Sequence, residues 1–180
     1  MLPWILSGYG ALLFLGPSAI LILPVYAVKI LRIGPERLGL LFSAAGVGTI
    51  LGALFLASLG SSPRRGRIYL KGIFIWVAAL TLFALSRSFW ISMAALLIFG
   101  SGQTLAGTTT ITMMQTRVPE QMRGRVMSLN SLIMGVRPLG DFPAGALIAG
   151  IGAPGTVLLS ASLVRVYGVV LAMRPVLRST

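Results

Sequence analysis

The chain has 180 residues, of which 56% are hydrophobic and 10% are charged, and its formal net charge is +12. About a quarter of the residues in a soluble domain are charged, so this composition excludes an ordinary soluble protein and indicates one embedded in a bilayer. Cysteine and histidine are both absent, which excludes disulfides, thiolate or imidazole metal sites and histidine-dependent catalysis. We therefore expect no metal ion and no cofactor.

Six segments are apolar enough to cross a bilayer, for which a helix needs about 20 residues. The first charge is Lys29, and the segment before it has no basic n-region and is too long for a signal peptide. We predict an all-α membrane protein in which residues 1–180 form a single bundle of six transmembrane helices. Their approximate ranges are 3–28, 38–60, 68–86, 89–115, 126–149 and 154–173. The sixth contains Arg165, for which the sequence offers no physical explanation.

The basic residues are unequally divided between the two sides that alternating helices would create. One side would hold nine of them: Arg64, Arg65, Arg67, Lys71, Arg117, Arg123, Arg125, Arg174 and Arg178. The other would hold four: Lys29, Arg32, Arg37 and Arg87. The positive-inside rule then predicts a cell-membrane protein with both termini in the cytoplasm. We interpret these clusters as topology signals and contacts with membrane lipid, and expect no nucleic-acid partner.

The segment RVPEQMRGRVMSLNSLIMGVRPLG, residues 117–140, carries two motifs. The first consists of Val118, Pro119, Arg123, Gly124, Arg125, Val126, Ser128 and Leu129, and the second of Gly135, Pro138, Leu139 and Gly140. Together they resemble a signature of the major facilitator superfamily, most closely its branch of macrolide-efflux proteins and enterobactin exporters. Residues 38–67 resemble helix eight of that family and the Gly-rich basic loop after it. The resemblance covers roughly residues 20–150.

The resemblance implies a fold of twelve helices in two six-helix halves around a central cavity, of which this chain matches helices seven to twelve. It implies part of a secondary active transporter that exports a small amphipathic molecule by alternating access. Because rocking needs two bundles, the chain alone would be an incomplete half. It would then need a missing N-terminal half, as a fragment or as one of two subunits. The alternative is a self-contained six-helix protein that acts as a homodimeric transporter or pore.

An enzyme is not expected. Glu36 and Glu120 are predicted on opposite sides of the membrane, so they cannot form a catalytic carboxylate pair. No GxxxxGK[ST] loop for ATP occurs in the sequence.

Two charges fall inside the fifth predicted helix. Arg137 and Asp141 are spaced i, i+4, so their side chains share one face and can pair. A charge at the centre of a membrane helix costs about 2.5–3.5 kcal/mol on insertion scales, which makes such residues candidates for function. Either Asp141 carries a coupling proton while Arg137 sets its affinity, or the two form a permanent structural ion pair.

The predicted helix 89–115 carries uncharged polar residues, namely Gln103, Thr104, Thr108, Thr109, Thr110 and Gln115. Gln103 and Thr110 are seven residues apart and can face one cavity, with Asn130 of the fifth helix as a further lining residue. Such groups suit an amphipathic substrate, although threonines also bond to carbonyls of their own helix. We expect Tyr26 to mark the membrane interface.

Two loops and one helix face complete the candidate residues. The loop residues are Arg64, Arg65, Arg67, Arg117, Arg123, Gly124 and Arg125, which either gate the transporter by pairing with neighbouring helix ends or only fix topology and contact lipid. Gly48 and Gly52 form a GxxxG face that lets another helix approach closely in the membrane.

Overall fold

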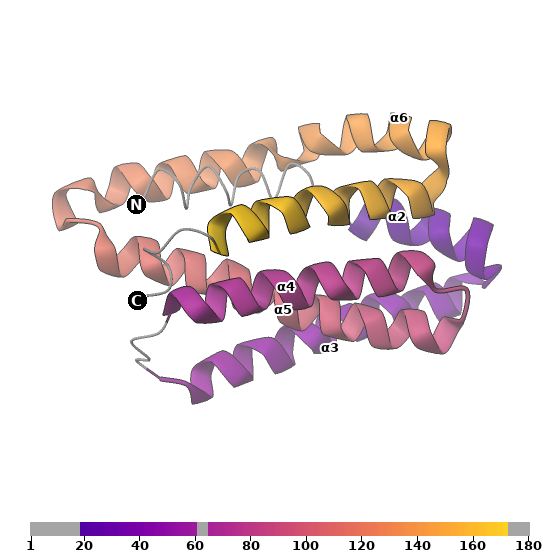
Figure 1. The fold of residues 1–180 in the computed structure, drawn as a ribbon, viewed down its shortest axis with the longest axis horizontal. Helices are drawn as coiled ribbons and strands as arrows, with labels where there is room; N and C mark the ends of the chain where they lie inside the picture. The colour runs from indigo at the N-terminus through magenta and orange to yellow at the C-terminus, as the bar shows by residue number, and fades with distance from the viewer. Residues whose placement is uncertain (1–18, 61–64, 173–180) are drawn as a thin grey trace.

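The computed structural model describes residues 19–60 and 65–172, and every regular element within these ranges is helical (Figure 1). In chain order these elements are α2 (Ala19–Tyr26), the π-helical turn η1 (Ala27–Leu31), α3 (Pro35–Ser58), α4 (Arg65–Leu85), α5 (Phe89–Arg117) and α6 (Glu120–Ala172). The start of α3 follows from local sequence, because Pro35 occupies the first helical turn, where its missing N–H costs nothing.

Helix α6 is broken at Gly152, where the backbone has φ 77° and ψ 167°. This positive φ favours glycine, which has no Cβ to clash with the backbone. Figure 1 shows the chain reversing there, so that the two parts of α6 run in opposite directions. We call residues 120–151 the first arm of α6 and residues 153–172 its second arm.

Four helical stretches are long and apolar enough to cross a membrane: Pro35–Ser58, Arg65–Leu85, Phe89–Thr116 and Pro143–Val170. The last includes the break at Gly152, so its residues are divided between the two arms of α6. Only 22–44% of each apolar stretch is buried inside the bundle. The remaining apolar surface faces outward, where lipid can cover it, and the chain is therefore a multi-pass membrane protein.

Helix α5 is the centre of the bundle and packs between α3 and α4. The second arm of α6 lies along the opposite side of α4 (Figure 1). Val164 of this arm joins Ile73 and Trp76 of α4 in one buried cluster, while Val157 joins Phe83 in a second cluster nearer the Gly152 break.

Glycine backbones form the contact between α3 and α5. A Cβ added to Gly52 would lie 2.8 Å from the Ser101 carbonyl oxygen, and one added to Gly48 or Gly100 would overlap the facing backbone. The Ser101 hydroxyl also donates a hydrogen bond to the Gly48 carbonyl at 2.9 Å. The two helices therefore touch through their main chains.

The contact between α5 and α4 is of the same kind. A Cβ added to Gly72 would lie 2.7 Å from the backbone nitrogen of Ala106, and one added to Gly102 would lie 2.7 Å from that of Trp76. Small residues permit this close approach, which in lipid is favoured by van der Waals contact rather than by hydrophobic burial.

Tyr26 ties α2 to the end of α4. Its side chain is fully buried, and its hydroxyl lies 3.0 Å from the Phe83 carbonyl oxygen and 2.9 Å from those of both Ala84 and Ser86. Carbonyls in the last turn of a helix have no partner within that helix, so the hydroxyl supplies one. The expectation that Tyr26 marks the membrane interface is wrong about its surroundings, because the ring packs inside the bundle.

Gly48→Ala is expected to lower the stability of the detergent-purified chain by about 1–3 kcal/mol, because the added methyl group overlaps the Leu97 carbonyl and separates α3 from α5. Gly46→Ala is the matched control, since nothing lies within 4 Å of its added Cβ; it should be neutral or slightly stabilising. Unfolding midpoints followed by tryptophan fluorescence would test this. Equal shifts in the two variants would contradict it.

Tyr26→Phe is expected to lower the free energy of unfolding by about 1–3 kcal/mol, because the buried carbonyls lose their hydrogen-bond donor. The ring itself would stay against Phe83, at a centroid distance of 4.5 Å. Ser162→Ala is the control: its exposed hydroxyl bonds only to Leu158 of its own helix. The same unfolding assay would compare the two variants, and an unchanged midpoint for Tyr26→Phe would contradict the assignment.

Candidate functional site

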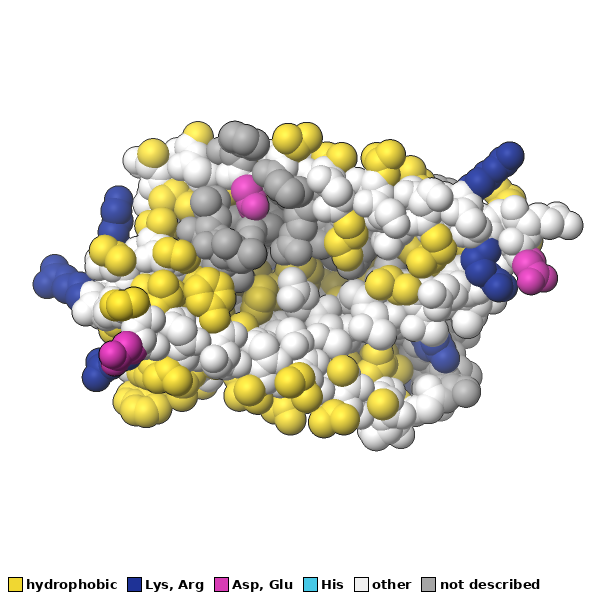
Figure 2. All heavy atoms as spheres, turned by 180° about the vertical axis from the view of Figure 1, so that it is seen from behind, with side chains coloured by type: hydrophobic (Ala, Val, Ile, Leu, Met, Phe, Trp, Pro, Cys, Tyr) yellow, Lys and Arg dark blue, Asp and Glu magenta, His cyan; other side chains and the backbone are white. Residues whose placement is uncertain are grey.

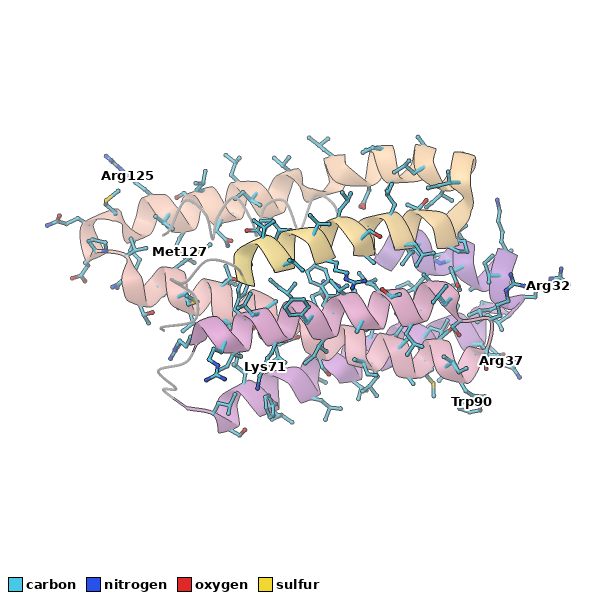
Figure 3. The ribbon with its side chains drawn as sticks, in the orientation of Figure 1. Arg32, Arg37, Lys71, Trp90, Arg125 and Met127 are labelled. Carbon is cyan, nitrogen blue, oxygen red and sulfur yellow. The ribbon has the colours of Figure 1, made fainter. Side chains whose placement is uncertain are left out.

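The charged side chains gather toward the two ends of the bundle, with apolar side chains between them (Figure 2). One end is formed where α3 and α5 finish and where α4 and α6 begin; we call it the basic end. Its described cations are Arg65, Arg67, Lys71, Arg123 and Arg125. The opposite end carries Lys29, Arg32, Glu36, Arg37 and Arg87. Figure 3 shows Arg125 at one end and Arg32 and Arg37 at the other.

The candidate gating residues all belong to the basic end. Arg65 is the first residue of α4 and is partly buried. The exposed members are Arg67, Arg123, Gly124 and Arg125. Arg64 and the side chain of Arg117 lie outside the described residues. The structure thus brings the two loops to one end of the bundle.

Two cavities of about 330 Å³ each lie between α3 and α4 near the basic end, with α5 as their floor. The first, which we call the threonine cavity, is lined by Ala53, Leu56, Arg65, Thr108, Thr109 and Thr112, among others. The second, the lysine cavity, is lined by Phe55, Arg67, Lys71, Ile75 and Leu105. Leu59 and Ile68 line both cavities, so they form the wall between them.

The candidate substrate residues lie on two different helices. Thr110 of α5 is fully buried, and its hydroxyl donates to the Ala106 carbonyl of the same helix at 2.8 Å. Gln103, also on α5, is partly buried. Asn130, on the first arm of α6, is 7% exposed, and its Oδ1 has no hydrogen-bond partner. None of the three lines the threonine or the lysine cavity.

Two further polar groups stand out that the sequence did not single out. The hydroxyl of Thr109 and the Nε1 of Trp76 are buried without a hydrogen-bond partner, although buried polar groups are normally bonded. Thr109 belongs to a run of three threonines, so the sequence marked the region as polar. Nothing in the sequence of that run distinguishes Thr110, whose hydroxyl bonds to its own helix, from Thr109, whose hydroxyl does not.

Asp141 lies on the first arm of α6 and is partly buried. The helix is continuous from residue 137 to residue 141, so the two positions are about one turn apart on one face. The side chain of Arg137 lies outside the described residues. Arg165 lies on the second arm and is exposed.

Glycine-mediated contacts, membrane-length apolar helices and charge gathered at the bundle ends define a polytopic membrane protein. A family model described as "Transmembrane secretion effector" matches residues 8–180. The chain therefore belongs to this family of major facilitator transporters and not to an enzyme family.

Curated relatives agree with the family. The chain is 30% identical to the enterobactin exporter EntS of Shigella flexneri and of Escherichia coli O1:K1, in each case over 153 residues that cover 85% of the chain. The identity to the enterobactin exporter EntS of Salmonella choleraesuis is also 30%, over 86% of the chain. The matched part is 36% of the length of each relative, so the chain spans about a third of these exporters.

Proposed function

We propose that the chain supplies helices seven to twelve of a major facilitator exporter, which moves a small amphipathic molecule out of the cytoplasm by alternating access. The observation that carries the proposal is the family match over residues 8–180, together with relatives that are named as exporters. Transport of this kind is binding and conformational change without covalent chemistry.

Six crossings account for the distribution of charge. The predicted helix 3–28, together with α3, α4, α5 and the two arms of α6, would give six single crossings. An even number of crossings returns the chain to its starting side, which is then the side of the basic end. Because basic loops are retained in the cytoplasm, both termini and the basic end are cytoplasmic in this proposal.

A partner bundle is the second element of the proposal. Alternating access requires one helical bundle to rock against another around a central site. The outward apolar surface of this chain offers faces for such a bundle: on α3, Ile50 is 59% and Leu54 is 62% exposed, and on the first arm of α6, Leu132 is 63% exposed. The partner is an N-terminal six-helix half or, in the alternative, a second copy of the chain.

The substrate path runs along α5 and the first arm of α6. Asn130 supports this assignment, because its unpartnered Oδ1 is a buried acceptor available to a ligand. Gln103 contributes an amide from α5. Thr110 retains only acceptor capacity, because its hydroxyl hydrogen is used within its own helix. Uncharged groups among apolar side chains suit an amphipathic cargo, and enterobactin, named for the relatives, is the first molecule to test.

Export should require the partner bundle. We expect no enterobactin secretion above background when the chain is expressed alone in cells that lack their own enterobactin exporter. Secretion should appear when the chain is expressed together with the reading frame immediately upstream, which should encode six further apolar segments. Enterobactin in the medium is the readout. Secretion by the chain alone, with a dimeric mass in detergent, would instead establish the homodimer; no secretion in either arrangement would contradict an enterobactin cargo.

Asp141 is the proposed coupling group. Arg137 lies four residues before it, about one turn away on the same helix. Asp141→Asn is expected to leave substrate binding intact and to abolish the response of export to a pH gradient, because the amide cannot accept a coupling proton. Asp141→Glu, which keeps a carboxylate, should retain the response. The measurement is export from proteoliposomes that contain the chain together with its partner bundle, with and without an imposed gradient. If Asp141→Asn still responded to the pH gradient, proton coupling through Asp141 would be contradicted, and the alternative of a structural ion pair with Arg137 would remain.

A further inference from the structure

The cations beside the lysine and threonine cavities have no acidic counterpart among the residues that line them. Arg65 lines the threonine cavity, and Arg67 and Lys71 line the lysine cavity. The whole chain has only 3 acidic residues against 15 basic ones, and none of the acidic residues lines either cavity. Among the described residues that line the two cavities, these cations therefore have no acidic side chain to neutralise them, and an anionic ligand would supply one.

The groove exists because α3 and α4 each pack on α5 rather than mainly on each other. Leu59, directly after the last residue of α3, and Ile68 of α4 line both cavities and separate one from the other. Figure 3 shows Lys71 on the side of α4 that faces α3. The groove thus holds cations on one wall, and a ligand in it would bridge two helices.

A hydrogen-bonding surface borders the same groove. The hydroxyl of Thr109, a residue only 2% exposed, has no partner. Thr112 lies nearly one turn further along α5 and also lines the threonine cavity. The Thr109 hydroxyl can donate to an oxygen atom of a ligand, whereas the Thr112 hydroxyl donates to the Thr108 carbonyl at 2.8 Å and can only accept from a ligand.

The lysine cavity is also strongly apolar. Phe55 is 56% exposed and Ile75 is 36% exposed, and Leu105 forms the floor between them. Arg67 and Lys71 are both exposed and lie one turn apart on α4, so both can reach one anionic group. Two cations directly beside exposed apolar side chains match an amphiphile with an anionic head and a hydrocarbon tail.

We propose that this groove is a binding site for one anionic phospholipid. Its phosphodiester lies against Arg67 and Lys71, its polar headgroup extends past Leu59 and Ile68 toward Arg65 and the threonines, and an acyl chain covers Phe55 and Ile75. The lipid bridges α3 and α4 where they are not joined by direct packing. The site rests on the membrane location of the chain and not on the proposed export, and basic pockets between membrane helices are known to hold such headgroups.

The test is native mass spectrometry of the full chain in detergent, titrated with phosphatidylglycerol or with zwitterionic phosphatidylcholine. We expect one retained phosphatidylglycerol and weak retention of phosphatidylcholine. Each cation near an anionic headgroup contributes roughly a five-fold factor, so Arg67→Gln/Lys71→Gln should weaken phosphatidylglycerol binding roughly 25-fold. The matched control is Arg87→Gln/Arg165→Gln, which also removes two exposed cations but lines neither cavity; its phosphatidylglycerol binding should be unchanged.

Thermal unfolding gives a second readout that separates lipid from free phosphate. Phosphatidylglycerol should raise the unfolding midpoint of the unmodified chain and of the control, but not of Arg67→Gln/Lys71→Gln. Inorganic phosphate at millimolar concentration should have no such effect, because it lacks the acyl chain that covers Phe55. The proposal would be overturned if the two double variants retained phosphatidylglycerol equally, or if the unmodified chain retained phosphatidylglycerol and phosphatidylcholine equally. It would also be overturned if inorganic phosphate raised the unfolding midpoint as much as phosphatidylglycerol does.

Discussion

Contact between helix backbones is the constraint on which the rest of this structure depends. Lipid tails are as apolar as leucine, so membrane helices gain little from hiding apolar side chains from lipid and must gain from close packing instead. Helix α5 meets this need on two sides, with Gly100 and Ser101 toward α3 and Gly102 toward α4. Because no side chain intervenes, the three helices form one layer whose spacing is fixed by main-chain atoms.

The groove at the basic end is a consequence of where those glycine contacts stop. On α3 the contacts with α5 lie at Gly48 and Gly52, and beyond them the chain continues with Phe55 and Leu59, which are large and exposed. Gly60 has no neighbour within 4 Å of a Cβ position. Residues 53–58 of α3 contain no glycine, and the space between this part of α3 and α4 holds the two cavities.

The sequence identified the family and the membrane class because both depend on local features: apolar runs, loop cations and a continuous motif over residues 117–140. It could not identify the partners of single residues. Gly72 and Gly102 stand in no GxxxG pair, and only the facing helix reveals why they must be small. Tyr26 looked like an interface residue because tyrosines collect there, but the carbonyls it caps are 57 to 60 positions away in the sequence. The neighbouring threonines show the same limit, since Thr110 bonds to its own helix and Thr109 does not.

The same packing bears on how a transporter of this family would move. Helices joined through their backbones cannot slide without breaking many contacts, so α3, α4 and α5 are expected to move as one body. The first arm of α6 has large exposed side chains, such as Leu132 and Leu139 at 63% and 56%, and ends at the glycine break. It carries Asn130 and Asp141, and a Cβ added to any of its described glycines, Gly124, Gly135, Gly145 and Gly150, would meet nothing within 4 Å. In the proposed transport, alternating access would need this arm to shift relative to the body formed by α3, α4 and α5, and the glycine packing of α5 is what would keep that body together.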